Sequence, residues 1–360
     1  MALHWAWACG ICGEEQNYGD SGWAYETAAF FKPNFTFTTA PPPRQPLAGY
    51  GGMNKGIRAN GGYFWTTPVW PQGALTDGVI QLHFYVLQGN TNARIRLLNA
   101  ADVILLELRL IAPTSTSNNF TFEVFSSEGG TATSRGTLTT YVNANSWHTL
   151  AIRFKPGTSG GYISVSLDGH VDNLVVNGNV GATSPWAKLK WDWVGGFFSY
   201  VTGISVWDSA ADAALTTPYW IPSLRPVADS NIGSWTDQAS GTSNLYATVD
   251  EDPISTADYC TTTTDPDEIR FTVETDNIDA NWAPATIEGV SVIGSMRGDG
   301  VLNTGQPVID DGSNNLLGTS QTTDAETSAG VNDVFPLQAD ASTPWTKAAL
   351  ETHSFGVRAS

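Results

Sequence analysis

The sequence predicts an all-β protein built on an antiparallel β-sandwich, and three observations lead to that fold class. Charged residues make up only 14% of the 360 residues, well below the ~25% usual in soluble domains. Glycine (36) and proline (19) are frequent, which favours strands joined by turns over long helices. Short stretches of alternating apolar and polar residues recur between residues 60 and 210, as is typical of a sandwich or barrel.

Eight strands are expected in this first half. Each has apolar residues at every second position, so that one face can be buried. Turn clusters rich in glycine and serine, such as 126–130 and 156–161, separate them. The expected strands are 78–86, 93–98, 103–110, 120–125, 135–142, 147–154, 162–167 and 203–207.

The second half is expected to form a smaller β domain. Strands are predicted at 244–249, 268–273, 285–293 and 355–358 because apolar residues alternate there. Residues 298–342 are polar and are expected to form long loops around weak strands. Thr343 followed by Pro344 predicts the start of a short helix that continues through residue 351.

A sharp change in charge supports a division between the two halves. Residues 1–212 carry a net charge of −2, whereas residues 213–360 carry −16. The segment 213–226, which contains three prolines, is interpreted as a structured linker. The expected domains are an N-terminal extension with the first strands at 1–59, the sandwich at 60–212, the linker at 213–226 and an acidic β domain at 227–360.

The overall charge argues against two classes of partner. The net charge is −18, and contacts to nucleic-acid phosphates or an anionic membrane need lysine and arginine. No stretch approaches the ~18 consecutive apolar residues of a membrane-spanning helix. The first ten residues are apolar but lack a basic region, so we do not expect a signal peptide.

The three cysteines do not predict a disulfide framework. Cys9 and Cys12 form a single Cys-x-x-Cys pair, and Cys260 is distant in sequence. The pair is interpreted as ordinary thiols, a local disulfide or a contact between subunits. A zinc site would need two more ligands, such as His4 and Cys260.

Catalytic motifs are missing from the sequence, so we expect a protein that is not an enzyme. No Gly-x-Ser-x-Gly turn or His-Glu-x-x-His pair occurs. Retaining glycosidases on a sandwich place paired acids on one strand face. Glu123 and Glu128 lack the middle acid of such a pattern, and the acids at 265–268 are interrupted by a proline.

Acidic clusters are the weak candidates for metal binding. Ca²⁺ takes six to eight oxygen ligands from flexible loops, but none of these clusters has the spacing of a known calcium loop. A solvated acidic face is the simpler interpretation, and no other cofactor is expected. The candidate ligands are Asp250, Asp252, Asp265 and Asp267.

Trp191 and Trp193 are the candidate ligand-binding residues. A strand through them would place both indoles on one face, with Lys190 and Asp192 opposite. Such a pair could form a planar platform for a sugar, or it could pack in the core. Both interpretations remain open at this point.

Part of the chain resembles laminin-G/concanavalin-A-like domains. The resemblance lies in Asn145, Trp147 and His148, which begin a strand, and in a second strand that ends at Asp168 and Gly169. Asp-Gly supplies the positive φ angles of a tight hairpin turn. Residues 203–208 are similar to the closing strand of that family. The resemblance implies a jelly-roll sandwich of two antiparallel sheets.

The layout also resembles a class of tailed-bacteriophage particle proteins. The similar elements are 222–226, 234–236, 250–259, 343–346 and 355–357. They imply a non-catalytic structural component of the particle, such as a head decoration, collar or tail appendage, assembled in the host cytoplasm. Its partners would be other virion proteins and copies of itself. The alternative is a carbohydrate-binding module that attaches to a host surface glycan, and a glycoside hydrolase comes third.

Overall fold

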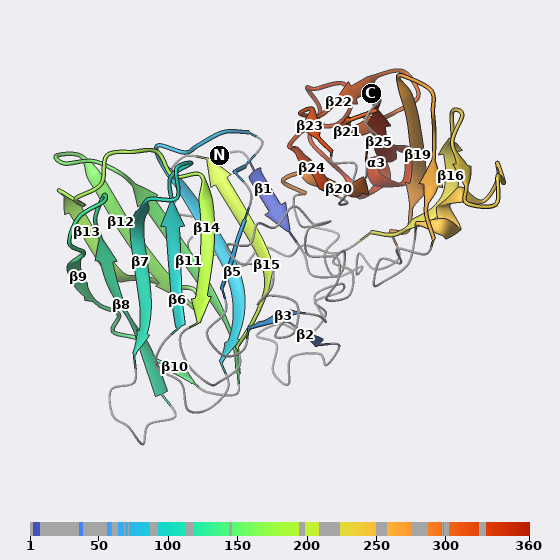
Figure 1. The fold of residues 1–360 in the computed structure, drawn as a ribbon. Helices are drawn as coiled ribbons and strands as arrows, with labels where there is room; N and C mark the ends of the chain where they lie inside the picture. Colours follow the sequence, from blue (N-terminus) through green and yellow to red (C-terminus); the bar gives the residue numbers. More distant parts are fainter. Residues whose placement is uncertain are drawn as a thin grey trace. The chain divides into compact units, whose positions relative to one another are not determined.

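The computed structural model describes most of the sandwich and of the C-terminal half (Figure 1). Described residues between 36 and 208 belong to one compact unit, and those between 224 and 360 belong to a second. The expected domain boundaries stay predictions, because residues 209–223 lie outside the description. The described ranges are 3–7, 36–38, 56–59, 64–67, 69–70, 72–86, 93–111, 119–143, 146–193, 199–208, 224–249, 258–275, 287–296, 298, 302–323 and 329–360.

The first unit is an antiparallel β-sandwich, which confirms the predicted all-β jelly-roll class. One sheet follows the order β13-β12-β11-β5-β15-β3-β2 and the other β10-β8-β7-β6-β14-β4, with β9 beside β8. The strands of the first sheet are β2 (Thr36–Thr38), β3 (Gly56–Ala59), β5 (Gly78–Val86), β11 (Ser146–Lys155), β12 (Gly161–Leu167), β13 (His170–Gly178) and β15 (Ser199–Asp208). Those of the second are β4 (Phe64–Thr66), β6 (Ala93–Leu98), β7 (Ile104–Ile111), β8 (Asn119–Ser126), β9 (Thr133–Thr137), β10 (Val142–Asn143) and β14 (Lys188–Trp193).

Aromatic rings fill the space between the two sheets. The ring centroid of Phe84 lies 5.7 Å from that of Phe122 and 6.3 Å from that of Trp191. Trp70 and Trp186 meet edge to face at 5.0 Å. Each of these five side chains is at most 1% exposed, and burial of one large apolar side chain contributes about 1.5–3 kcal/mol.

The predicted hairpin around residues 147–167 is present. Strand β11 pairs with β12, with Leu150 opposite Leu167 and Phe154 opposite Ile163. Asp168 (φ 53°) and Gly169 (φ 77°) then turn the chain into β13, as a type I′ turn requires. The Asp168 carboxylate also accepts a hydrogen bond from the Thr149 amide at 2.8 Å, which ties the turn to β11.

One predicted strand of the sandwich differs in the structure, and strands β2, β3, β4 and β13 were not predicted. The expected strand 135–142 is split into β9 and β10, with Gly136 at φ 129°. That backbone angle takes the chain out of an extended strand. In the edge strand β13, apolar and polar residues alternate too weakly for the strand to be predicted from its sequence.

Within its described residues, the second unit contains one larger sheet and two strand pairs. The larger sheet follows the order β16-β19-β25-β21-β22, with β23 beside β21. Its strands are β16 (Pro226–Asn231), β19 (Asp267–Val273), β21 (Thr304–Asp310), β22 (Asn315–Leu317), β23 (Gln321–Thr322) and β25 (Ser354–Ala359). The pairs are β17 (Thr236–Asp237) with β18 (Cys260–Thr261), and β20 (Val290–Met296) with β24 (Ala329–Phe335).

Two apolar clusters hold the second unit together. In one, Trp345 packs with Phe355 at a centroid distance of 5.8 Å, and its Nε1 donates to the Phe335 carbonyl at 2.8 Å. In the other, Trp235 packs with Ile269. Residues 298–342, expected to form long loops around weak strands, contain strands β21 to β24, of which β21 and β24 are each seven residues long.

Two further predictions for this half are wrong. The expected strand 244–249 is a 3-10 helix, η3 (Leu245–Thr248), because the Asp229 carboxylate accepts from the amides of Leu245 at 3.1 Å and Tyr246 at 2.8 Å. The short helix α3 (Lys347–Thr352) begins after Thr346, not at Thr343. Within the described ranges, no helix is both long and apolar enough to cross a membrane.

Candidate functional site

Strands β14, β6, β7 and β8 are neighbours in the smaller sheet (Figure 1). Their outer face carries charged side chains. Alternation places them opposite the aliphatic side chains that fill the sandwich core. Strand pairing aligns them in two rows across the sheet. The first row is Lys190, Arg96, Glu107 and Phe125, and the second is Arg94, Arg109 and Glu123. We call these seven residues the charged face.

Glu107 is the centre of the charged face. Arg96 Nε donates to one carboxylate oxygen at 2.6 Å, and Arg109 Nε donates to the other. The Glu107 side chain is only 6% exposed, whereas that of Arg109 is 36% exposed. One carboxylate therefore fixes two guanidinium groups, and the more exposed of them reaches solvent.

The same contacts keep Glu107 ionised. Burial by itself would raise the pKa of this carboxyl, but the hydrogen bonds from Arg109 and Arg96 outweigh it and the pKa is lowered. A general acid of a glycosidase needs the opposite shift, a raised pKa. Glu107 is therefore suited to hold arginines in place and unsuited to donate a proton.

An aromatic ring completes the site. The Arg109 guanidinium lies over the Phe125 ring, with its central carbon 3.8 Å from the ring centroid. Arginine presents a planar set of donors that suits paired oxygen acceptors. Arg109 is the most exposed member of this network, and its fixed guanidinium can donate to paired oxygens of a ligand.

The structure places Trp191 in the core. It is 1% exposed and its ring lies near Phe84, so its faces are covered by protein. The interpretation of Trp191 as a surface platform is therefore corrected in favour of core packing: strand alternation turns Lys190 outward and the indole inward. The side chain of Trp193 lies outside the described residues, and its role stays a prediction.

The acidic candidates for metal binding are only partly described. Asp250 and Asp252 lie outside the description, and Asp265 is exposed. Asp267 is buried and its carboxylate accepts from the Ser234 amide at 3.0 Å and the Thr262 hydroxyl at 2.6 Å. Among the described residues, no group of three or more His, Cys, Asp or Glu could hold a metal ion. Asp267 thus has a structural role.

The cysteine predictions are not settled. Cys9 and Cys12 lie outside the described residues, so their proposed disulfide or subunit contact stays a prediction. Cys260 has intermediate exposure and packs against the Trp235 cluster.

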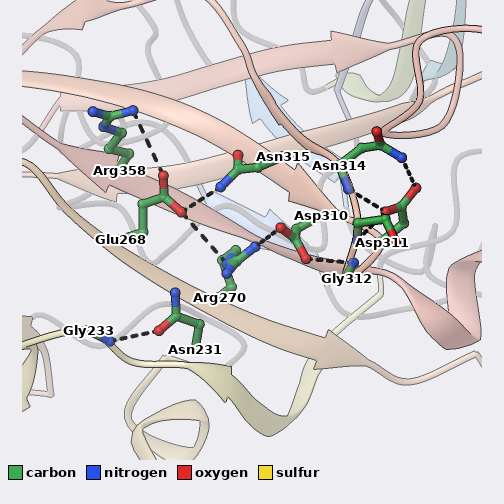
Figure 2. Close-up of polar contacts among 11 residues, drawn as sticks. Asn231, Gly233, Glu268, Arg270, Asp310, Asp311, Gly312, Asn314, Asn315 and Arg358 are labelled. Atoms are coloured by element: carbon green, nitrogen blue, oxygen red, sulfur yellow. Dashed lines mark hydrogen bonds and ion pairs between the residues drawn. The ribbon is translucent and has the colours of Figure 1, made fainter.

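A second charged cluster lies on the sheet of the C-terminal unit. Figure 2 shows Arg270 between Glu268 and Asp310, with Arg358 on the other side of Glu268. Asn315 also donates to Glu268 at 2.9 Å. Two cations face two anions here, so the cluster is neutral, as expected of a cross-strand structural network.

A signal for the charged face was present in the sequence. Arg94 and Arg96 alternate with aliphatic residues within one strand, and Glu107 and Arg109 do so in the next. Charges at alternate positions indicate which strand face points away from the core. What the sequence lacks is the register that brings Arg96 and Glu107 together.

Comparison with known proteins gives only weak likenesses. No protein-family model matches the sequence, and no curated protein is significantly similar to it. Similar solved structures include an endo-β-1,4-glucuronan lyase from Trichoderma reesei (11% identity, 59% of this chain and 98% of that chain, TM-score 0.38). Others are the carbohydrate-binding module CBM66 from Bacillus subtilis (16%, 52% and 96%, 0.32) and the CBM2 module of the evolved Dit of Lactobacillus casei BL23 phage J-1 (12%, 52% and 93%, 0.29). At these TM-scores the likeness has no bearing on function.

Proposed function

We propose that this protein is a carbohydrate-binding module whose ligand lies on the charged face. The observation that supports this most directly is the Arg96–Glu107–Arg109 network beside Phe125. Its donors and acceptors are fixed before a ligand arrives, so little conformational entropy is lost on binding. Sugars offer paired hydroxyl oxygens to such planar donors, and the Arg109 side chain is 36% exposed.

The test is binding of the purified protein to an array of glycans, followed by titration of the best ligand. Arg109→Lys keeps the charge but loses the planar fork, and it should weaken binding about tenfold. Lys155→Gln is the control, because Lys155 is exposed and lies on the other sheet. A wild-type protein that binds no glycan, or an Arg109→Lys variant that binds as well as wild type, would contradict the proposal.

The protein acts without catalysis in this proposal. Glu107 is held ionised by two arginines, and hydrogen bonds from Ser184 and Thr183 lower the pKa of Glu128 to about 2. Neither carboxyl can serve as a general acid near neutral pH. Prolonged incubation of the purified protein with a bound glycan should release no new reducing ends. Release of reducing ends by the purified protein would support the hydrolase instead.

We further propose that this module belongs to a tailed-bacteriophage particle, either as a structural component or as an adhesin. The support is the resemblance noted above, whose elements recur here as core residues of the second unit: Trp235, Trp345 and Phe355. Mass spectrometry of purified particles and labelling with an antibody against this chain test the assignment. A chain that appears in lysates but never in washed particles would be inconsistent with it.

A further inference from the structure

We propose that a doubly protonated His148 links the two sheets of the sandwich, and that loss of one ring proton loosens strand β10. His148 lies in β11 of the larger sheet and is 4% exposed. Its Nδ1 lies 2.6 Å from a carboxylate oxygen of Asp168, in the turn after β12. Its Nε2 lies 3.0 Å from the main-chain carbonyl oxygen of Asn143, in β10 of the smaller sheet. The ring therefore bridges the two sheets.

Both groups that face the ring are hydrogen-bond acceptors. An ionised carboxylate and a main-chain carbonyl can only accept. A neutral imidazole has a single N–H, so it can donate to one of these oxygens and must turn a lone pair toward the other. An imidazolium has two N–H groups and satisfies both contacts at once. A buried cation also needs a charged partner, and the Asp168 carboxylate is in contact with the His148 ring.

The surroundings of the ring leave its protonation to one partner. Among the described residues, Asp168 is the one charged group in contact with His148. Opposite His148 on β5 is Phe84, whose ring centroid lies 5.6 Å away. His83, the preceding residue of β5, points to the other face of the strand. His170 on β13 is exposed, and β10 has no titratable side chain.

Loss of one proton should break the bond to Asn143 and keep the bond to Asp168. A hydrogen bond to a carboxylate is stronger than one to a neutral carbonyl, so the remaining proton stays on Nδ1. Asp168 is also fixed to β11 by two further bonds: its Oδ1 accepts from the Thr149 amide at 2.8 Å, and its amide donates to the Thr149 carbonyl at 2.8 Å. Strand β10 is two residues long and lies at the edge of its sheet, beside β8. It is therefore the element that loosens.

The test follows wild-type protein by NMR from about pH 5 to about pH 8, the range in which imidazole loses its charge. At the lower pH both ring nitrogens of His148 should show slowly exchanging N–H protons, whereas an exposed ring such as His170 exchanges them rapidly with water. At the higher pH the Nε2 proton should be lost. The amide protection factors of β10, which are corrected for the intrinsic exchange rate, should then fall about tenfold.

Two variants should abolish this pH response. His148→Gln has no titratable ring. Asp168→Asn lacks the charge but still tolerates a positive φ angle and still offers an acceptor to the Thr149 amide. His170→Gln is the matched control, because it removes an exposed histidine beside the same turn, and it should respond as wild type does.

The wild-type spectra decide the question even if His148→Gln fails to fold. A single slowly exchanging ring N–H at the lower pH would overturn the proposal. So would protection factors of β10 that change with pH equally in wild type and Asp168→Asn. The inference does not involve glycan binding, so its failure leaves the proposed function standing.

Discussion

At the scale of single residues, Glu107 links the stability of the sandwich to its proposed site. It is the buried partner of two arginines, and removal of one partner from a buried charge network leaves the others uncompensated. Glu107→Gln should therefore lower the free energy of unfolding by about 2 kcal/mol and weaken glycan binding. Urea denaturation and titration of the ligand measure the two effects.

The matched control for Glu107 is Glu123→Gln. Glu123 lies on the same face but is half-buried and accepts one side-chain hydrogen bond, from Ser134 at 2.9 Å. Its loss should cost about 0.5 kcal/mol. Equal destabilisation by the two variants would show that Glu107 has no special role in organising the arginines.

The free energy of unfolding should depend on pH through Glu128. Hydrogen bonds from Ser184 and Thr183 lower its pKa to about 2, from 4.5 in the unfolded chain. The folded state therefore binds this proton less readily. The resulting stability is fully present above about pH 4.5 and is lost as the pH falls toward about 2.

The prediction is that wild type and Glu128→Gln differ in stability at pH 7 and converge near pH 2. Ser184→Ala, which removes one donor to Glu128, should lie between them. Thermal unfolding followed at several pH values measures the difference. A gap between wild type and Glu128→Gln that stays constant from pH 7 to pH 2 would contradict the assignment.

At the scale of elements, the turn after β12 tests why the hairpin forms. Gly169 has φ 77°, and a side chain in this left-handed region costs about 1–2 kcal/mol. Gly169→Ala should lower the free energy of unfolding by that amount, as measured in urea. Gly160→Ala is the control, because Gly160 is in a loop, has no positive φ and has open space around its Cα.

Many strands of the sandwich could be predicted because apolar and polar residues alternate along them with a period of two, which matches their buried and outward faces. In β6 the aliphatic Ile95 and Leu97 alternate with Arg94 and Arg96, so pattern and burial agree. The failures have local causes. The carboxylate of Asp229 holds η3 as a 3-10 turn, and that contact joins residues far apart in sequence.

The candidate site was harder to predict than the strands. Both faces of β14 carry large side chains, so the sequence alone did not decide whether Trp191 or Lys190 faces the core. Pairing of β14 with β6 settles it, because Lys190 aligns with Arg96 and Trp191 with Ile95. Such cross-strand partners come from chain segments about a hundred residues apart, and periodicity carries no information on them.

At the scale of the whole molecule, the proposed binding site and most of the net negative charge lie in different units. The charged face belongs to the first half, which is nearly neutral, whereas the second half carries −16. Each unit has its own buried apolar residues, so each is stabilised by its own hydrophobic core. This division predicts that a defect in one core leaves the other unit folded.

Leu350→Ala tests that independence. Leu350 is 3% exposed in the cluster around Trp345, and such a truncation costs about 2–5 kcal/mol. Calorimetry should show two transitions, of which only one moves to lower temperature in this variant, while glycan binding persists at 25 °C. Leu82→Ala, in the sandwich core, should move the other transition and weaken binding. A single transition shifted equally by both variants would mean that the two units unfold as one, and the binding face would then depend on the acidic half for its stability.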